Sequence, residues 1–307
     1  MEMICIACPG QGSQAPGFLE PWLDIPVFKQ QIEKASDVLG LDLIHFGTVA
    51  DADAIRDTKV AQPLIVAAGI ASYLTLTERF GESLKVSAAA GHSVGEITAA
   101  FVSGIFDADN ALKFVQQRGN EMAAAAALTP SSMAAVVGGE LDTVVSHLES
   151  LGLFAANYNG SGQVVAAGSK EAIANLVASP PAGTRVVALQ VAGAFHTSFM
   201  EPAKPALEAF SKQLNVKNPE ISIWSNRSGE LVDSGQDFLE LMVNQVSNPV
   251  RWDKTMDSMQ SANVSVMIEL LPAGALSGIA KRAMPNTVAI ALKTPADLDK
   301  VAEAIGK

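Results

Sequence analysis

A serine between two glycines is the residue of this sequence best placed to act as a nucleophile. Ser93 is the middle residue of Gly-His-Ser-Val-Gly at positions 91–95. An apolar run of strand length, 86–90, precedes this turn, and a helical pattern, 96–103, follows it. That context is typical of a nucleophile elbow, whose small flanking residues permit a strained turn. The following helix directs free N–H groups toward a developing oxyanion. Ser93 is therefore predicted to carry an acyl group as an ester.

A serine hydroxyl is a weak nucleophile, so it needs a base within hydrogen-bond distance. His196 is favoured among the four histidines because it lies in a loop of small residues after a strand, where catalytic groups of open α/β sheets are found. His92 is adjacent to Ser93, and its side chain should leave the turn in another direction. His147 is expected on a helix surface and His45 in a structural position. For His196 too, a structural role is the alternative.

The loop 9–14, Pro-Gly-Gln-Gly-Ser-Gln, follows the first apolar strand and is a second candidate part of the site. Its two glycines flank Gln11, and such a turn can bring a backbone N–H close to the nucleophile as an oxyanion donor. The alternatives are a simple connection between a strand and a helix, or a weak phosphate loop. Because the loop has neither the G-x-G-x-x-G spacing nor the lysine of a P-loop, nucleotide binding is not expected.

The composition favours a large soluble α/β protein. The chain has 307 residues, of which 49% are hydrophobic and only 17% charged, which suits a large core and argues against disorder. Its formal net charge of −11 would repel a phosphate backbone, so nucleic-acid binding is not expected. The N-terminus has no basic region and no long uncharged apolar run, which predicts a cytoplasmic protein without a membrane partner.

The only two cysteines, Cys5 and Cys8, form a C-x-x-C pair within an apolar run that is typical of a buried strand. A second cysteine pair is absent, and a strand does not present both thiols as a helix N-terminus would. Core packing is therefore predicted for both residues, since a free cysteine behaves as a small hydrophobe. No metal site is expected.

Alternating strand and helix patterns predict an α/β protein of two domains. The segment 129–197 has the order β-α-β-β-α-β of a ferredoxin-like domain, inserted into a larger domain formed by 1–128 and 198–307. In the larger domain, strand–helix alternation implies a mainly parallel sheet covered on both faces. The expected strands are 3–8, 86–90, 132–137, 153–158, 163–167, 185–190, 221–225, 264–270 and 288–291. The expected helices are 26–40, 60–80, 96–103, 107–126, 142–150, 170–178, 200–214, 235–247, 252–262 and one that begins near 275.

Five segments, in order, resemble those of the malonyl-CoA:acyl carrier protein transacylases, the discrete acyltransferases of type II fatty acid synthesis. They are Pro-Gly-Gln-Gly-Ser-Gln at 9–14, Gly-His-Ser-Val-Gly-Glu at 91–96, Gln-Arg-Gly at 117–119, Gly-Ala-Phe-His at 193–196 and Asn-Pro-Val-Arg-Trp at 248–252. The resemblance runs from residue 4 to about residue 283. It implies an α/β-hydrolase-like large domain with an inserted ferredoxin-like α+β small domain.

The resemblance also implies a ping-pong mechanism. Ser93 would take the malonyl group from malonyl-CoA and pass it to the phosphopantetheine thiol of acyl carrier protein, with His196 as general base and then acid. The backbone N–H groups of Gln11 and Val94 would form the oxyanion hole. The backbone carbonyl of Gln245 would orient His196 in place of the acid of a catalytic triad. No bound cofactor is implied.

A pocket for the malonyl group is implied as well. Arg118 would bind its free carboxylate, because the guanidinium fork suits a carboxylate; without the resemblance, a surface arginine is an equal alternative. Phe195 would crowd an α-methyl group and so favour malonyl over methylmalonyl units. Gln62 and Met122 are further pocket residues by the same resemblance.

Two other functions compete with malonyl transfer. A serine hydrolase shares the elbow but explains neither Arg118 nor the lack of an evident triad acid, and a non-catalytic docking module predicts no acyl-enzyme. The expected partners are malonyl-CoA and acyl carrier protein, and the chain is expected to be a monomer. Since carrier protein and chain are both acidic, docking needs local cations. Lys281 and Arg282 are the first candidates, and Lys204 and Arg251 follow.

Overall fold

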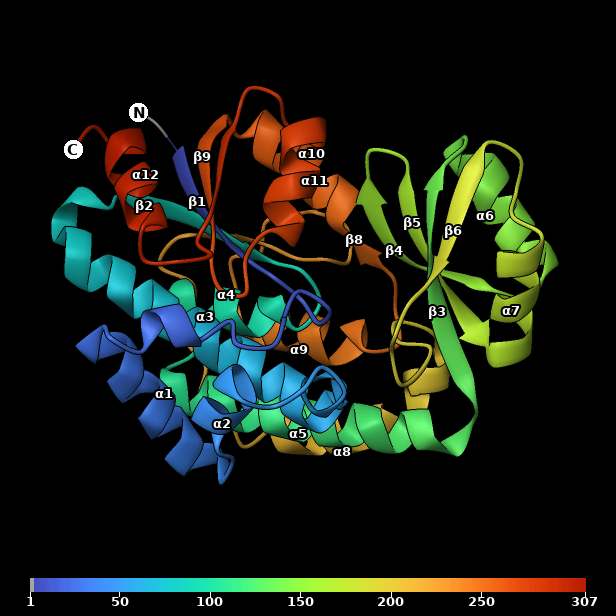
Figure 1. Ribbon diagram of the computed structural model, residues 1–307, viewed down its shortest axis with the longest axis horizontal. Helices are drawn as coiled ribbons and strands as arrows, with labels where there is room; N and C mark the ends of the chain where they lie inside the picture. The colour runs from blue at the N-terminus through green and yellow to red at the C-terminus, as the bar shows by residue number, and fades with distance from the viewer. Residues whose placement is uncertain (1–2) are drawn as a thin grey trace.

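The apolar run near the N-terminus forms the central strand of a five-stranded parallel sheet in the computed structural model, which describes residues 3–307. The order of strands in this sheet is β10-β9-β1-β2-β7 (Figure 1). Their bounds are β1 (Met3–Cys8), β2 (Val86–Gly91), β7 (Ser222–Trp224), β9 (Val264–Glu269) and β10 (Val288–Ala291). Neighbouring strands are joined by crossovers, so their carboxyl ends meet at one edge.

Helices cover both faces of the large sheet because successive residues of its strands, which point to opposite faces, are apolar. In β1, Ile4, Ile6 and Cys8 pack on one face, and Cys5 and Ala7 pack on the other. The side chains of the first face share one core with α1 (Pro26–Leu39), α2 (Leu43–Thr48), α3 (Thr58–Phe80), α4 (Gly95–Val102), α5 (Ala108–Leu128), α8 (Lys204–Ser211), α9 (Gly235–Gln245) and α12 (Asp297–Ala304). The second face carries α10 (Trp252–Ser261) and α11 (Ala275–Ala283).

The smaller part of the molecule is a second five-stranded sheet with the order β6-β3-β5-β4-β8, on the right in Figure 1. Its strands are β3 (Ser131–Gly138), β4 (Phe154–Gly160), β5 (Gln163–Ser169), β6 (Thr184–Ala188) and β8 (Val250–Arg251). Helices α6 (Leu141–Ser150) and α7 (Lys170–Ala178) cover its outer face. On β3, Ala134 and Val136 pack against these helices, whereas Met133 and Ala135 line a cavity on the opposite face. The free face of this sheet is therefore one wall of the cavity.

Helix α3 is the one described helix long and apolar enough to span a membrane. The stretch Thr58–Ser83 passes that test by length and composition, but 78% of its most apolar window is buried inside the protein. Asp57 caps its N-terminus by accepting from the N–H of Lys59 at 2.9 Å, and Pro63 lies within its second turn. Helix α3 thus belongs to the protein core.

The sequence prediction misses α2, α12 and the two-residue strand β8. Val250 and Arg251 pair in parallel with β4, so a segment that follows the small domain in sequence completes the small sheet. The predicted helix 200–214 is a 3₁₀ segment, η4 (Ser198–Ala203), followed by α8, which ends at Ser211. Pro202 and Pro205 lack the N–H that a continuous helix needs. The domain limits 1–128, 129–197 and 198–307 stay a prediction.

The two cysteines are both buried free thiols, which confirms their predicted place in the core. Cys5 and Cys8 point to opposite faces of β1, as their different packing clusters show. Burial raises the pKa of both thiols, so neither is a ready thiolate.

Candidate active site

The turn between β2 and α4 holds Ser93 in the left-handed region, with φ at 55°. A β-carbon on Gly91 would lie 2.1 Å from the carbonyl carbon of Gly95, and one on Gly95 would lie 2.1 Å from the carbonyl oxygen of Cys8. Only glycine fits at either position. Backbone strain of this kind at a non-glycine residue is typical of functional sites and costs about 1–3 kcal/mol. The turn therefore has the geometry of a nucleophile elbow.

Asn226, which follows the neighbouring strand β7, stabilises this turn through two hydrogen bonds. Its Oδ1 accepts from the N–H of Ser93 at 2.7 Å, and its Nδ2 donates to the carbonyl of Gly91 at 2.6 Å. Asn226 is fully buried. The sequence prediction does not include Asn226, although its place directly after a parallel strand was a usable signal.

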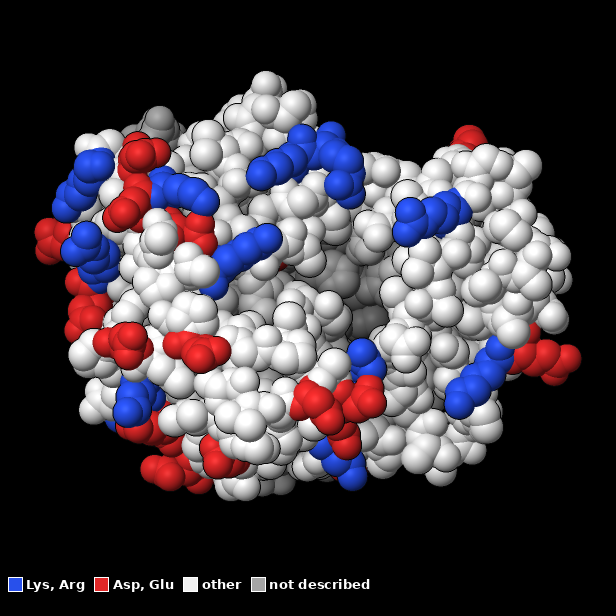
Figure 2. All heavy atoms as spheres, in the orientation of Figure 1, with Lys and Arg blue, Asp and Glu red and all other residues white. Residues whose placement is uncertain are grey.

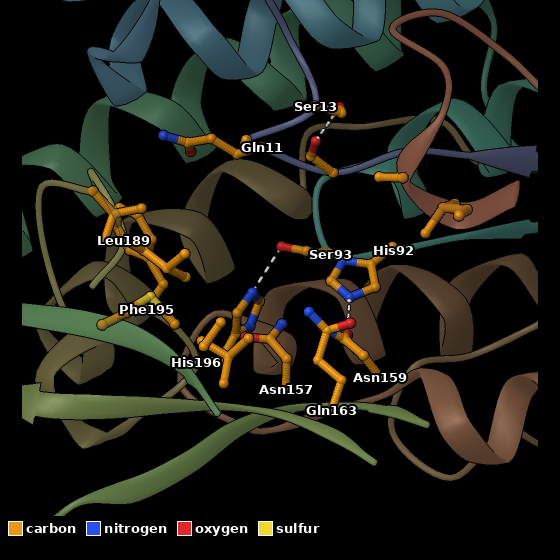
Figure 3. A pocket seen from close by; sticks show the side chains of 18 of the residues that line it. Gln11, Ser13, His92, Ser93, Asn157, Asn159, Gln163, Leu189, Phe195 and His196 are labelled. Atoms are coloured by element: carbon orange, nitrogen blue, oxygen red, sulfur yellow. Dashed lines mark hydrogen bonds between the residues drawn. The ribbon is translucent and has the colours of Figure 1, made fainter. Parts of the chain in front are cut away.

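His196 forms a dyad with Ser93 (Figure 3). Its Nε2 lies 2.7 Å from Ser93 Oγ, and its Nδ1 lies 2.8 Å from the carbonyl oxygen of Gln245. Because a carbonyl can only accept, Nδ1 carries the proton and Nε2 is free to accept one from the serine. Burial, and secondly the charge of Arg118, lower the pKa of His196 to about 3. The imidazole is consequently a neutral base at pH 7.

Arg118, on α5, is a buried cation beside Ser93. Its Nη1 donates to Oε1 of Gln62 at 2.7 Å, and its Nη2 donates to Oε1 of Gln245 at 2.8 Å. The same Nη2 lies 3.4 Å from Ser93 Oγ. Within residues 3–307, no Asp or Glu forms an ion pair with it. Burial lowers the pKa of Arg118 to about 10, which leaves it charged at pH 7. Its charge is therefore available to an anionic group beside Ser93.

Ser93 and His196 open into a cavity of about 530 Å³ between the large and small sheets. Figure 2 shows the hollow between the two parts of the molecule, with Lys and Arg side chains on its rim. Phe195, Gln62 and Met122 line it, with Met122 Sδ 3.5 Å from Gln62 Nε2. Across from them, the small sheet contributes Asn157 and Asn159 (Figure 3).

Two backbone donors are left free beside Ser93. Across the described chain 3–307, the N–H groups of Gln11 and Val94 have no hydrogen-bond acceptor in the protein. The loop that carries Gln11 packs closely on the elbow, since a β-carbon on Gly10 would lie 2.7 Å from the carbonyl oxygen of His92. Val94 caps the N-terminus of α4, where free N–H groups are expected. Both donors could serve an oxyanion.

A family model described as "Acyl transferase domain" matches residues 6–302. The chain belongs to the acyl transferase family. This acyltransferase is 45% identical over 300 residues to the malonyl CoA-acyl carrier protein transacylase of Mycobacterium bovis, with 98% of this chain and 99% of that protein covered. It is 31% identical over 310 residues to the transacylase of the same name from Haemophilus influenzae, with 99% of each chain covered.

Solved structures agree with this membership. The acyltransferase superposes on MCAT from Mycobacterium tuberculosis with a TM-score of 0.93 at 44% identity, covering 98% of this chain and 100% of that one. It also superposes on a malonyl-transacylase in complex with a type II PKS acyl-carrier protein, with a TM-score of 0.92 at 28% identity, covering 99% and 100%. The α/β fold with a parallel sheet and a smaller second sheet, predicted from the sequence, is thereby confirmed.

The other histidines of the acyltransferase take no part in the dyad. His92 lies beside Ser93 in sequence, but its Nε2 is 2.9 Å from Oδ1 of Asn159 on β4, so it joins the elbow to the small sheet (Figure 3). His45 is exposed on α2, and His147 is half-buried on α6. Within residues 3–307, no group of three or more His, Cys, Asp or Glu residues is arranged to hold a metal ion.

Proposed function

We propose that this acyltransferase moves the malonyl group of malonyl-CoA to the phosphopantetheine thiol of acyl carrier protein and so supplies extender units for fatty acid synthesis. The observation that carries the proposal is the buried Arg118, which forms no ion pair with an acidic residue of the described part of the chain, 3–307, and lies 3.4 Å from Ser93 Oγ. A malonyl thioester ends in a carboxylate, so it supplies the missing charge. The names of the similar proteins agree with this substrate pair.

In the first half of the reaction, Ser93 Oγ attacks the thioester carbonyl and His196 Nε2 takes the hydroxyl proton. The N–H groups of Gln11 and Val94 stabilise the tetrahedral oxyanion. The carbon–sulfur bond then breaks, and His196 returns its proton to the departing CoA thiolate. Malonyl-Ser93 is left, with its carboxylate on Arg118.

The second half repeats these steps with another thiol. The phosphopantetheine thiol of the carrier protein gives its proton to His196 and attacks the ester carbonyl. The bond from Ser93 Oγ to the acyl carbon breaks, and His196 protonates the serine oxygen. The carbonyl of Gln245 keeps the imidazole in one tautomer through both halves without adding negative charge beside the malonyl carboxylate.

A competition among acyl-CoA substrates tests the proposal. With equal malonyl-, methylmalonyl- and acetyl-CoA and holo acyl carrier protein, we expect malonyl-carrier protein to predominate. Phe195 is buried in the cavity wall, so its ring should exclude an α-methyl group. Phe195→Ser should raise the methylmalonyl share about 10-fold, the usual worth of a methyl group in an apolar pocket. Release of free malonate faster than carrier loading would show a hydrolase, and equal methylmalonyl transfer by the unaltered protein would refute the role of Phe195.

For the carrier protein we propose a docking site at the end of α11. Lys281 and Arg282 are exposed there, and Arg282 also lines the cavity. The other two candidates are engaged: Lys204 pairs with Glu201 at 3.5 Å, and Arg251 binds Asp253 through two hydrogen bonds. We further propose that the protein acts as a cytoplasmic monomer.

Reversing the charge of Lys281 and Arg282 to glutamate is expected to raise KM for acyl carrier protein about 10-fold at low salt, with little change in kcat, because rim charges act mainly on encounter. Steady-state kinetics at two ionic strengths measure this effect. The control with the same change of net charge is Lys29→Glu with Lys113→Glu, two exposed lysines outside the cavity. An equal KM in both double variants would count against this docking site.

A further inference from the structure

A buried carboxylate with no part in the transfer steps lies in the first turn of α4, next to the elbow. Glu96 Oε1 accepts from the backbone N–H of Asn226 at 2.6 Å, and Oε2 accepts from Nε2 of Gln245. Glu96 is 1% exposed. Burial raises the pKa of Glu96 to about 8, and the Asn226 N–H and the Arg118 charge offset that shift only in part. Both oxygens nevertheless act as acceptors, so the hydrogen-bond geometry matches the ionised form. Burying a charged carboxylate costs free energy unless hydrogen bonds compensate it, so the hydrogen bonds of Glu96 indicate a functional role.

The side chain of Gln245 joins Glu96 to Arg118. Its Nε2 donates to Glu96, and its Oε1 accepts from Arg118 Nη2 at 2.8 Å. A primary amide has a donor at one end and an acceptor at the other. Because a carboxylate can only accept, Glu96 holds the NH₂ of the amide on its own side, so that the amide oxygen faces the guanidinium. The Ser93 carbonyl and Asn226 Oδ1 accept from the same NH₂, each at the longer distance of 3.2 Å. Arg118 is thus held in place, yet no direct ion pair neutralises it.

Glu96 is also linked to Ser93 and His196. Its hydrogen-bond partners Gln245 and Asn226 make these links. Gln245 Nε2 lies 3.2 Å from the carbonyl of Ser93, and the backbone carbonyl of Gln245 accepts from His196. Asn226, held by Glu96 at its N–H, binds the N–H of Ser93 in turn. The nucleophile, the base and the cation therefore depend on one buried network.

We propose that Glu96 is a positioning residue that sets the preference for malonyl over uncharged acyl groups, because it holds the Gln245 amide with its oxygen on Arg118. This inference rests on the proposed function. The amide acts as a spacer between the two charges, so the guanidinium is oriented without losing its attraction for the substrate carboxylate.

The test is Glu96→Gln, which keeps the shape and removes the charge. The new amide can accept from the N–H of Asn226 only if its NH₂ faces the NH₂ of Gln245. Gln245 then relieves the clash by turning its own amide, which places an NH₂ against Arg118. We expect kcat/KM for malonyl-CoA to fall about 10- to 100-fold, the worth of a hydrogen bond to a charged group. Transfer from acetyl-CoA should fall much less, so the malonyl-to-acetyl ratio drops.

The exchange variant Glu96→Gln with Gln245→Glu separates orientation from charge. It keeps the contacts of position 96 with Asn226 and position 245, loses the donor that Gln245 Nε2 offers to the Ser93 carbonyl and to Asn226 Oδ1, and puts a carboxylate directly on Arg118. We expect a lower melting temperature from those two lost hydrogen bonds and a malonyl-to-acetyl ratio that stays low. If the exchange restored that ratio, the spacer role would be wrong. If Glu96→Gln fails to fold, the malonyl-to-acetyl ratio of the exchange variant alone tests the inference.

Glu269→Gln is the matched control. Glu269 is also fully buried and accepts from the N–H groups of Leu276 and Ser277 at 2.9 and 2.8 Å, with no hydrogen bond to Ser93, His196 or Arg118. Its loss should lower the melting temperature but leave the malonyl-to-acetyl ratio unchanged. If the unaltered protein prefers malonyl and Glu96→Gln retains that preference, the inference is wrong and the proposed function stands. If the unaltered protein has no such preference, the proposed function itself fails.

Discussion

Replacement of Ser93 by alanine abolishes the malonyl-enzyme and lowers kcat at least about 10⁴-fold, since the loss of a catalytic serine removes the covalent route altogether. Ser93 Oγ is the hydroxyl held 2.7 Å from the Nε2 of a neutral imidazole. The expected measurement is intact mass after mixing with malonyl-CoA. The unaltered protein should gain one malonyl group, which peptide mapping places on the segment that contains Ser93.

A second serine of the cavity provides the control. Ser13 donates its hydroxyl to the carbonyl of Gly10 at 2.6 Å, and it has no base beside it. Ser13→Ala should still form the malonyl ester on Ser93. An ester that persists in Ser93→Ala, or that maps to another residue, would overturn the mechanism from its first step.

Arg118→Ala is expected to lower kcat/KM for malonyl-CoA by about 10²- to 10³-fold, because it removes the buried partner of a charged group. Transfer of the uncharged acetyl group should be retained, so the malonyl-to-acetyl ratio collapses. The truncation also leaves the Oε1 atoms of Gln62 and Gln245 without their donor. Stability should consequently fall by about 1–3 kcal/mol, the cost of unsatisfied buried acceptors. Kinetics with both substrates and thermal melting measure the two effects.

Two variants show whether the effect belongs to the guanidinium. Arg118→Lys keeps the charge without the planar fork, so it should recover only part of the malonyl preference. Arg56 also lines the cavity but pairs with Asp53, and Arg56→Ala should keep the preference. An unchanged malonyl-to-acetyl ratio in Arg118→Ala would show that another group recognises the carboxylate.

Local patterns were sufficient to predict the fold and the position of the elbow turn at Ser93. The strand before Ser93 and the helix after it are visible in the period of their hydrophobic residues, and the two glycines are visible as small residues. All of these features lie within a few residues of one another. The β-α-β-β-α-β order of the small domain follows from the same periods. The position of His196 in a loop after a strand favoured it as the base but left a structural role open. The predicted roles of His196 and Arg118 therefore depended on the family resemblance, because a histidine or an arginine alone has several possible places.

Residue patterns were therefore enough to predict the α/β class, the elbow at Ser93 and the family. The folded chain was needed to reveal the network of Glu96, Gln245 and Asn226, and the addition of β8 to the small sheet. The reason is physical: a buried polar group must find its hydrogen-bond partner in space, and these partners lie far apart in sequence. Glu96 is 130 positions from Asn226 and 149 from Gln245, a separation that no local pattern encodes.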